Sequence, residues 1–463
     1  ARVQGDVATL QTSSVELSYT RHRAPAAAQL NVSSRGSPVY RYHWGDDPEI
    51  GNLRGTARTM DNNAETLDLN CHHKVSPTTD NSEQHCTWGL VSKLGWAVVN
   101  ETGMPVVKDG WYAPSRNTED VSVFLHGLDF AGALKDFVDA AGEPPVPPRW
   151  ALGSIFTRWF NFDGDSVIRQ IDDFESAAFP LDAWIFDMNW HTFGPWGALT
   201  WSRFDFPRLQ EMLDTVQSLR LPVGANVHEH DGIRPEEQTY KAFCAALGVP
   251  PSGETLEFDL YNSTYAHAQE DVAIRALDTK EGKQGIDFFW IDYQQGEVDT
   301  FQKTTIPRLN PTIVLNTLRF EDAARRGERR RPVIVSRWGG LGSHRTPVGF
   351  SGDQKHGWKG LAFLPYFTST AANVAYGYWS HDVVGGQLDD GSTWADYELS
   401  VRWIQTAAWS PVFRMHDKGA GTGDCASEGA CARVVPMDLP SFAFRAAREA
   451  VQLRDLLVPY IYT

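Results

Sequence analysis

Long apolar runs and clusters of basic residues are scarce in this sequence. No stretch approaches the roughly 20 consecutive apolar residues of a membrane-spanning helix, so we predict no membrane span. The chain has 42 Lys and Arg against 58 Asp and Glu, a net charge of −16. A phosphate-binding surface needs clustered Lys and Arg, so this balance argues against a nucleic-acid partner. With 42% hydrophobic residues, the chain is globular and not disordered.

Cysteine is also rare, and the five that occur form no Cys-x-x-Cys motif. This counts against zinc-ribbon and thioredoxin-like proteins. Cys71 and Cys86 bracket one short polar stretch, and Cys425 and Cys431 bracket another. We expect each pair to form a local disulfide in an oxidising compartment, with free buried thiols as the alternative. Cys244, in the helical stretch YKAFCAAL, is expected to be a buried free thiol.

Three glycosylation sequons point to the same compartment, at Asn31, Asn100 and Asn262. Each is weak alone, but together with the cysteine pairs they favour a protein of the secretory pathway, extracellular or lumenal. The sequence starts with Ala and has no apolar signal segment, which is typical of a processed chain.

Aromatic residues are abundant, with 17 Trp, 24 Phe and 14 Tyr. Aromatic faces stack on the C–H-rich faces of sugars, so an acidic, Trp-rich chain is typical of proteins that hold carbohydrate. Trp also fills protein cores, and the composition alone therefore gives only a hint.

The organisation of the chain changes near residue 140. Residues 1–140 hold many short β-rich stretches separated by Asp, Asn, Gly and Pro clusters, which predicts an antiparallel β-sandwich domain. Residues 141–150 hold four Pro and resemble a stiff linker. Over residues 151–463, apolar strands then alternate with amphipathic helices. Eight such units are the count of a closed (β/α)8 TIM barrel, so we predict an α/β fold in which this barrel follows the β-sandwich.

The predicted strands and helices follow from the apolar runs and their periodicity. The expected strands are residues 151–156, 183–188, 222–228, 287–292, 332–337, 348–353, 375–382 and 411–416. The expected helices are residues 164–177, 206–220, 270–284, 310–326 and 441–462.

Each predicted strand ends on or just before a polar residue, and catalytic groups of TIM barrels lie at these carboxyl ends. The residues are Arg158, Asp187, His228, Asp292, Arg337, Asp353, Asp382 and His416. One such Asp could simply cap the following helix. Four of them, with two His and two Arg, favour a catalytic site.

Two of these carboxylates suit the cleavage of a glycosidic bond with retention of configuration, which needs two carboxyl groups about 5–5.5 Å apart. Asp292 is the expected nucleophile and Asp353 the expected acid/base, because strands four and six end over the same cavity. Phe350 and Trp358 could raise the pKa of Asp353 by desolvation. Arg337 could hold a sugar hydroxyl and keep a carboxylate charged.

Ordered motifs over nearly all of residues 145–463 resemble glycoside hydrolase family 31, the α-glucosidase and α-xylosidase family. PPRWALGSIFTRW resembles its first barrel strand, and WIDYQQG its nucleophile segment. SRWGG…VGFSGDQ resembles its S-R-S…W-x-G-D-N segment, with the same sixteen-residue step from Arg337 to Asp353. WIFDMNW, YWSHDVVGG and SPVFRMH resemble three further segments, and NLRGTARTMDN resembles a loop from the N-terminal domain.

The resemblance implies a glycosidase that needs no metal or cofactor, with Asp292 and Asp353 as catalytic residues. It also implies binding of a carbohydrate substrate by residues of the same motifs and strand ends. These candidate substrate-binding residues are Asp187, Arg337, His416, Asp382, Trp290, Phe350, His228 and Asp61. The family usually continues past the barrel into one or two further β domains, so the resemblance implies that these are missing, truncated, or carried by a second polypeptide made by processing.

Departures from the family pattern leave the sugar open. Tyr293-Gln294-Gln295 follows the nucleophile where Met-Asn-Glu is usual, and Phe350 replaces a Trp. The segment VGANVHEHDGIRP also differs from the version of this strand that is common in α-glucosidases. Its His228, His230 and Asp231 could hold zinc at this spacing, although sugar binding is preferred.

Several alternatives to an α-glucosidase stay open at this point. They are an α-N-acetylgalactosaminidase or α-galactosidase, a transglycosylase of the same family, and a carbohydrate-binding or structural glycoprotein that kept the fold without catalysis.

Overall fold

The computed structural model describes residues 1–22, 29–61, 63, 65–69, 71, 86–115, 119–192, 197–278, 285–292, 306, 308–326, 331–384, 387–388, 396–417 and 436–463.

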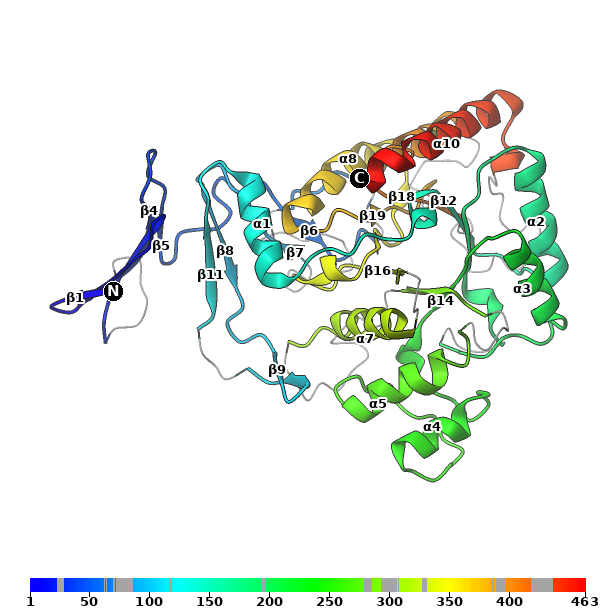
Figure 1. Cartoon of the computed structure of the whole chain (residues 1–463). Helices are drawn as coiled ribbons and strands as arrows, with labels where there is room; N and C mark the ends of the chain where they lie inside the picture. Colours follow the sequence, from blue (N-terminus) through cyan, green and yellow to red (C-terminus); the bar gives the residue numbers. More distant parts are fainter. Residues whose placement is uncertain are drawn as a thin grey trace.

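Antiparallel strands build the N-terminal part. The first sheet is β1 (Arg2–Gln4), β2 (Val7–Gln11), β3 (Val15–Thr20), β4 (Leu30–Ser34) and β5 (Arg41–His43), paired in sequence order. Three two-stranded ribbons follow: β6 (Thr56–Ala57) with β7 (Cys86–Thr87), β8 (Trp96–Asn100) with β11 (Val121–Leu125), and β9 (Val106–Lys108) with β10 (Trp111–Ala113). The five-stranded sheet stands at one end of the molecule (Figure 1). The expected N-terminal antiparallel β domain is confirmed.

One helix, α1 (Phe130–Ala141), lies in this part, where only strands were expected. The Asp129 side chain caps it by accepting from the amide of Gly132 at 2.9 Å. Ala133 and Phe137, one turn apart, are its buried residues, and the Phe137 ring lies 5.1 Å from the ring of His344. The helix therefore packs its apolar face against the barrel.

Eight parallel strands form the barrel, as predicted. They are β12 (Ser154–Arg158), β13 (Ala183–Phe186), β14 (Val223–Val227), β15 (Phe288–Ile291), β16 (Ile334–Ser336), β17 (Gly349–Phe350), β19 (Trp379–Ser380) and β21 (Phe413–Asp417). β12 pairs with both β13 and β21. A parallel bridge from Val383, just after β19, to Met415 of β21 closes the ring. Each expected strand range contains one of these strands in whole or in large part.

Helices surround the strands (Figure 1). They are α2 (Gly164–Ser176), α3 (Leu209–Ser218), α4 (Tyr240–Leu247), α5 (Ser263–Ala268), α7 (Pro311–Arg326), α8 (Trp358–Ala371), α9 (Tyr397–Ala407) and α10 (Ser441–Tyr462). Four of the five expected helices match α2, α3, α7 and α10. In the fifth range, 270–284, the described helix is a π-helical segment, η4 (Gln269–Ile274). Helices α5, α8 and α9 were not expected, whereas α4 contains the stretch YKAFCAAL, which was expected to be helical.

The barrel interior is apolar below the strand ends. One buried cluster joins Ile155, Ile185, Trp290, Val335 and Phe350, which come from five different strands. Residues buried on a closed barrel's inner face fill it like a core, so no open pore runs through it.

The cysteine predictions are settled for three residues. Cys71 and Cys86 form a disulfide across 15 residues, and Cys244 is a buried free thiol in α4. Cys425 and Cys431 lie outside the described residues. None of the helices in the described part of the chain combines the length and apolar character needed to cross a membrane.

Candidate active site

Polar side chains from seven of the eight barrel strands meet at the carboxyl end of the barrel. Hydrogen bonds and ion pairs connect them in one network, which also includes the loop that carries Asp61. The members, in order along the network, are Asp353, Asp61, Arg337, Asp292, Asn226, Asp187, His416, Asp382 and Arg414. The structure thus brings together the carboxylates that were predicted from separate motifs.

Asp292 directly follows β15 and is held at both oxygens. Its Oδ1 accepts from Nη2 of Arg337 at 3.0 Å, and its Oδ2 lies 3.3 Å from both Nδ2 of Asn226 and Nε2 of His228. Burial alone would raise the pKa of Asp292, but Arg337 and then His228 outweigh it and lower that pKa. A carboxylate kept charged and oriented in this way suits a nucleophile.

Arg337, which follows β16, links the barrel to the N-terminal domain. Its Nη1 donates to Oδ2 of Asp61 at 2.7 Å and also to the hydroxyl of Thr59. Burial lowers the pKa of Arg337, but the charges of Asp61 and then of Asp292 outweigh this effect, and the pKa is raised. The N-terminal loop therefore reaches the candidate site, where its Asp61 contacts Arg337.

Asp353 lies in the same corner, three residues past the end of β17. Its amide donates to Oδ1 of Asp61 at 2.6 Å, and nearby the amide of Met60 donates to the carbonyl of Ser351 at 2.7 Å. The N-terminal loop thus fixes the backbone that carries the candidate acid/base. Trp358, expected to desolvate this carboxyl, is half exposed, and its indole donates to Asp396.

Gly352 makes this arrangement possible. Its φ of +83° lies in the left-handed region, and a Cβ there would meet Nη1 of Arg337 at 2.1 Å and Oδ1 of Asp61 at 2.5 Å. No larger residue fits between these groups. Glycine is therefore required at this position for Asp61, Arg337 and Asp353 to approach one another.

Asp187 and His416 lie on the opposite side of Asp292. Oδ2 of Asp187 lies 3.1 Å from Nε2 of His416, and its Oδ1 accepts from Nδ2 of Asn226 at 3.1 Å. Because the same Asn226 amide also reaches Asp292, it spaces two carboxylates that would otherwise repel. Binding of sugar hydroxyls by Asp187 and His416 stays a prediction.

Asp382 and Arg414 form a fully buried pair beside them. Nη2 of Arg414 donates to Oδ1 of Asp382, and Nδ1 of His416 lies 3.7 Å from its Oδ2. Burial raises the pKa of Asp382, and Arg414 only partly offsets this. Asp292 and Asp382 therefore have pKa values moved in opposite directions within one site.

Trp290 and Phe350 form the floor of the site. Their rings meet edge to face with centroids 5.5 Å apart, and only 2% and 0% of their surfaces are exposed. The guanidinium of Arg414 lies 4.5 Å from the Trp290 ring, and that of Arg337 lies 4.9 Å from the Phe350 ring. The two aromatic residues support the arginines, and direct contact with a sugar stays a prediction for both.

The possible zinc cluster is split between two environments. His228 reaches Asp292, whereas Nε2 of His230 pairs with Oδ1 of Asp231 at 2.9 Å. Oδ2 of Asp231 accepts from the amide of Gly197 at 3.0 Å. Within the described ranges, no group of three or more His, Cys, Asp or Glu side chains could hold a metal ion.

Three residues of the network were missed by the sequence analysis: Thr59, Asn226 and Arg414. Asn226 and Arg414 could have been suspected, since Asn226 interrupts the apolar strand β14 and Arg414 stands between the buried apolar residues Phe413 and Met415 of β21. A buried amide or guanidinium needs partners, which are available at the polar end of the barrel. Thr59 carries no such signal, because its contact depends on how the N-terminal loop docks.

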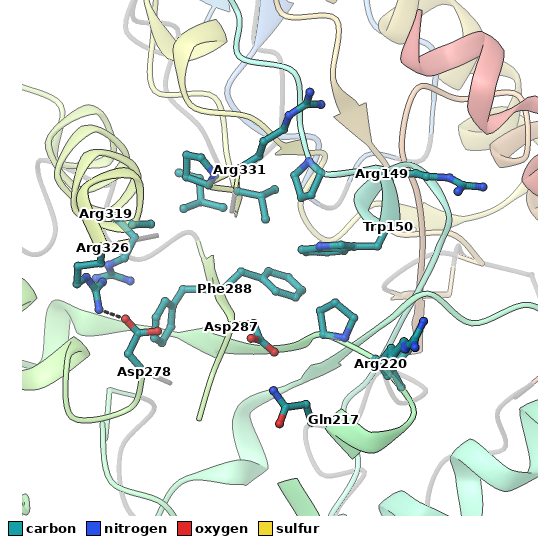
Figure 2. Close-up of a pocket in the computed structure, with 18 of the residues that line it drawn as sticks. Arg149, Trp150, Gln217, Arg220, Asp278, Asp287, Phe288, Arg319, Arg326 and Arg331 are labelled. Carbon is teal, nitrogen blue, oxygen red and sulfur yellow. Dashed lines mark ion pairs between the residues drawn. The ribbon is translucent and has the colours of Figure 1, made fainter. Parts of the chain in front are cut away.

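A cavity of about 1170 Å³ lies at the opposite, amino-terminal end of the barrel strands. The residues that line it include Arg149, Trp150, Arg220 and Phe288 (Figure 2). None of the candidate catalytic residues lines it. Because catalytic groups of TIM barrels gather at the carboxyl ends of the strands, we place the site there and not in this cavity.

Residues 144–463 match the family model described as "Glycosyl hydrolases family 31 TIM-barrel domain". An alpha-xylosidase from Saccharolobus solfataricus is 24% identical over 366 residues, covering 76% of this chain and 47% of that protein. An alpha-glucosidase from the same organism is 22% identical over 386 residues, covering 73% and 53%. The chain spans about half the length of these curated relatives.

Solved structures share the fold across the whole chain. A GH31 dextranase from Flavobacterium johnsoniae, complexed with glucose, has a TM-score of 0.71 and 16% identity, covering 99% of this chain and 61% of that one. A xylosidase from Aspergillus niger has a TM-score of 0.70 and 16% identity, covering 99% and 74%. At these identities the likeness shows the fold alone.

Proposed function

The chain belongs to glycosyl hydrolase family 31, and from this premise we propose that it cleaves α-glycosidic bonds with retention of configuration, on an α-glucoside-like substrate. The observation that carries the proposal is Asp292. It is a buried carboxylate whose pKa is lowered by Arg337 and His228, and both its oxygens are oriented by donors. The names of the relatives, alpha-xylosidase and alpha-glucosidase, support an α-linked substrate.

In the first step, an oxygen of Asp292 attacks the anomeric carbon. The bond from that carbon to the glycosidic oxygen breaks, and the carboxyl of Asp353 gives its proton to the leaving oxygen. The products are a free alcohol, a glycosyl ester on Asp292 and a carboxylate on Asp353. Arg337 withdraws charge from Oδ1 of Asp292, which lets this carboxylate leave again in the second step.

In the second step, Asp353 takes a proton from water as the water oxygen bonds to the anomeric carbon. The ester bond to Asp292 breaks, and the carboxylate is restored. Two inversions give net retention. If a sugar hydroxyl replaces water, the same step becomes transglycosylation, so one site supports both outcomes.

The substrate would be held around this pair by polar groups of the same network. Asp187 and His416, 3.1 Å apart, face the position of the sugar from the far side of Asp292. Carboxylate and imidazole groups recognise vicinal hydroxyls by charge-assisted hydrogen bonds. His228, which contacts Asp292 itself, is the residue where a different sugar would be recognised.

The substrate class is tested with p-nitrophenyl α-glycosides of glucose, xylose, galactose and N-acetylgalactosamine. We expect α-glucoside or α-xyloside to be cleaved fastest, and Asp292→Ala to abolish cleavage of every member. Preference for the galactose or N-acetylgalactosamine compound would move the proposal to that sugar. Equal background for wild type and Asp292→Ala on all four would refute an enzymatic function.

Retention is tested by trapping the intermediate. A 5-fluoro-α-glycosyl fluoride should add its sugar mass to the peptide that contains Asp292. Asp353→Ala should retain cleavage of substrates with activated leaving groups, because these need no proton. Loss of activity on activated and ordinary substrates alike would count against the acid role of Asp353.

We also propose that the protein works in an oxidising, secretory compartment. The Cys71–Cys86 disulfide supports this, and Asn100 and Asn262 lie on the exposed surface. Expression in a eukaryotic secretory host, followed by N-glycosidase treatment, should give a mass decrease. An unchanged mass would refute glycosylation at the three sequons.

A further inference from the structure

Three charged side chains form a buried cluster outside the network described above. Arg319 of α7 donates from Nε to Oε2 of Glu270 at 2.7 Å and from Nη2 to its Oε1 at 3.0 Å. The same Nη2 also donates to Oε1 of Glu229. Only 1% of the Arg319 side chain, 4% of Glu270 and none of Glu229 is exposed to solvent. One guanidinium thus connects two carboxylates that come from different segments.

The cluster is linked to the candidate nucleophile through Glu229 and its neighbour His228. Glu229 begins the short turn η3 (Glu229–Asp231), and the preceding residue is His228, whose Nε2 lies 3.3 Å from Oδ2 of Asp292. The far end of the turn is held as well, because Asp231 accepts from the amide of Gly197. The position of the His228 ring therefore depends on where Glu229 is anchored.

The other carboxylate comes from an unusual helix. Glu270 lies in the π-helical segment η4, where the amide of Arg275 donates to the carbonyl of Glu270 at 3.1 Å, five residues earlier. π-Helical turns are rare and occur frequently at functional sites. Here the widened turn carries the carboxylate that binds Arg319 through two parallel hydrogen bonds, a geometry that fixes direction as well as distance.

We propose that Arg319, clamped by Glu270, is a positioning residue that fixes Glu229 and, through it, the contact of His228 with Asp292. The inference rests on the proposed function, in which Asp292 is the nucleophile. A misplacement of about 1 Å can cost about a hundredfold in rate. Loss of the clamp should therefore lower turnover even though Arg319 touches no reacting atom.

The cavity at the amino-terminal end of the barrel offers a direct test. Arg319 lines that cavity, as does Arg326, two turns further along α7 (Figure 2). Arg326 pairs instead with Asp278 and Asp322. Truncation of either arginine leaves a space that is continuous with the cavity, so a guanidinium ion from solution can enter it.

The experiment compares Arg319→Ala with Arg326→Ala, on the α-glycoside that the wild type cleaves fastest. We expect Arg319→Ala to lower kcat about 10- to 100-fold while KM changes less than about threefold. Guanidinium chloride at millimolar concentration should restore much of this loss, and urea at the same concentration should not. Arg326→Ala should keep kcat and should show no response to guanidinium.

A second variant covers the case in which Arg319→Ala does not fold. Glu229→Gln keeps the size of the side chain but removes the charge that Arg319 holds. We expect a fall in kcat of about tenfold, with KM nearly unchanged, because the tether and not the substrate contact is weakened.

The outcomes separate this inference from the proposed function. A wild type inactive on every α-glycoside overturns the function and the inference together. An active wild type with unchanged kcat in Arg319→Ala and Glu229→Gln overturns the inference alone. Lower stability without a change in kcat, or a loss of kcat in Arg319→Ala that guanidinium does not restore, also overturns it.

Discussion

Replacing Arg337 by methionine keeps most of the side-chain length and removes a cation that two carboxylates share. Nη2 of Arg337 lies 3.0 Å from Oδ1 of Asp292, and Nη1 lies 2.7 Å from Oδ2 of Asp61. At an effective dielectric constant of about 20, unit charges this close attract by about 5 kcal/mol before the cost of burial is counted. Removal of one partner of a buried pair typically costs about 3–5 kcal/mol, and we expect that loss at neutral pH.

The loss should depend on pH in a direction that follows from the pKa of Asp292. In the wild type the pKa of Asp292 is lowered. The Asp292 carboxylate therefore stabilises the folded state at neutral pH, and this stabilisation is lost as the pH falls through that lowered pKa. Without Arg337, only His228 opposes the effect of burial on the pKa of Asp292, so the charged form contributes less stability at neutral pH. The difference in the free energy of unfolding between Arg337→Met and the wild type should therefore become smaller in acid.

Urea unfolding at neutral pH and in mild acid measures this difference. Arg208→Met is the matched control, because Arg208 is exposed and pairs with Asp165 and Glu211 at the surface. The control should change the free energy of unfolding by less than about 0.5 kcal/mol. This account of the site is refuted if Arg337→Met loses no more free energy of unfolding than the control. It is also refuted if the loss is equal at both pH values.

Two other predictions concern single contacts. Gly352→Ala should lower kcat/KM more than about a hundredfold, because its Cβ would displace Arg337. The control is Gly110→Ala, which has a similar φ of +81° but lies in open space and should leave kcat/KM unchanged. Steady-state kinetics measures both variants. Cys71→Ser should lower the free energy of unfolding by about 3 kcal/mol, because the Cys71–Cys86 disulfide closes a loop with a sequence separation of 15. Dithiothreitol should lower the thermal stability of the wild type but not that of Cys71→Ser.

The barrel was predictable because its strands are buried on both faces. Runs such as residues 183–186 and 288–291 are fully buried in the structure, and such strands read as continuous apolar stretches. Helix α2 was predictable because Val167, Ile171 and Phe174 keep helical spacing and Asp163 forms a capping box with Ser166. In both cases, a local pattern of side chains reflects directly what each element buries.

Helix α8 was missed for the opposite reason. It buries Leu361, Phe363, Leu364 and Phe367 and carries Pro365 inside it. A helix apolar over most of its surface has no clear 3.6-residue period, and a proline inside it argues against helix. Nothing local in the sequence shows that neighbouring elements cover it.

The site was predictable in its residues but not in its connections. Asp292, Arg337 and Asp353 could be named from strand ends and motif spacing. Their pairing through Asp61 joins residues 276 and 292 positions apart in the chain, so it depends on how the N-terminal loop docks on the barrel. Single-sequence patterns do not carry such a long-range contact.

Phe350 contacts both arginines that pair with the carboxylates Asp292 and Asp382. The guanidinium carbons of Arg337 and Arg414 lie 4.9 and 5.2 Å from the centroid of its buried ring. A guanidinium that lies on an aromatic face keeps its N–H groups free to donate in its own plane. Arg337 donates to Asp292, whose pKa is lowered. Arg414 donates to Asp382, whose pKa is raised by burial because this arginine only partly offsets it. We therefore expect Phe350→Leu to move both arginines and to disturb both halves of the site, although Phe350 itself carries no charge.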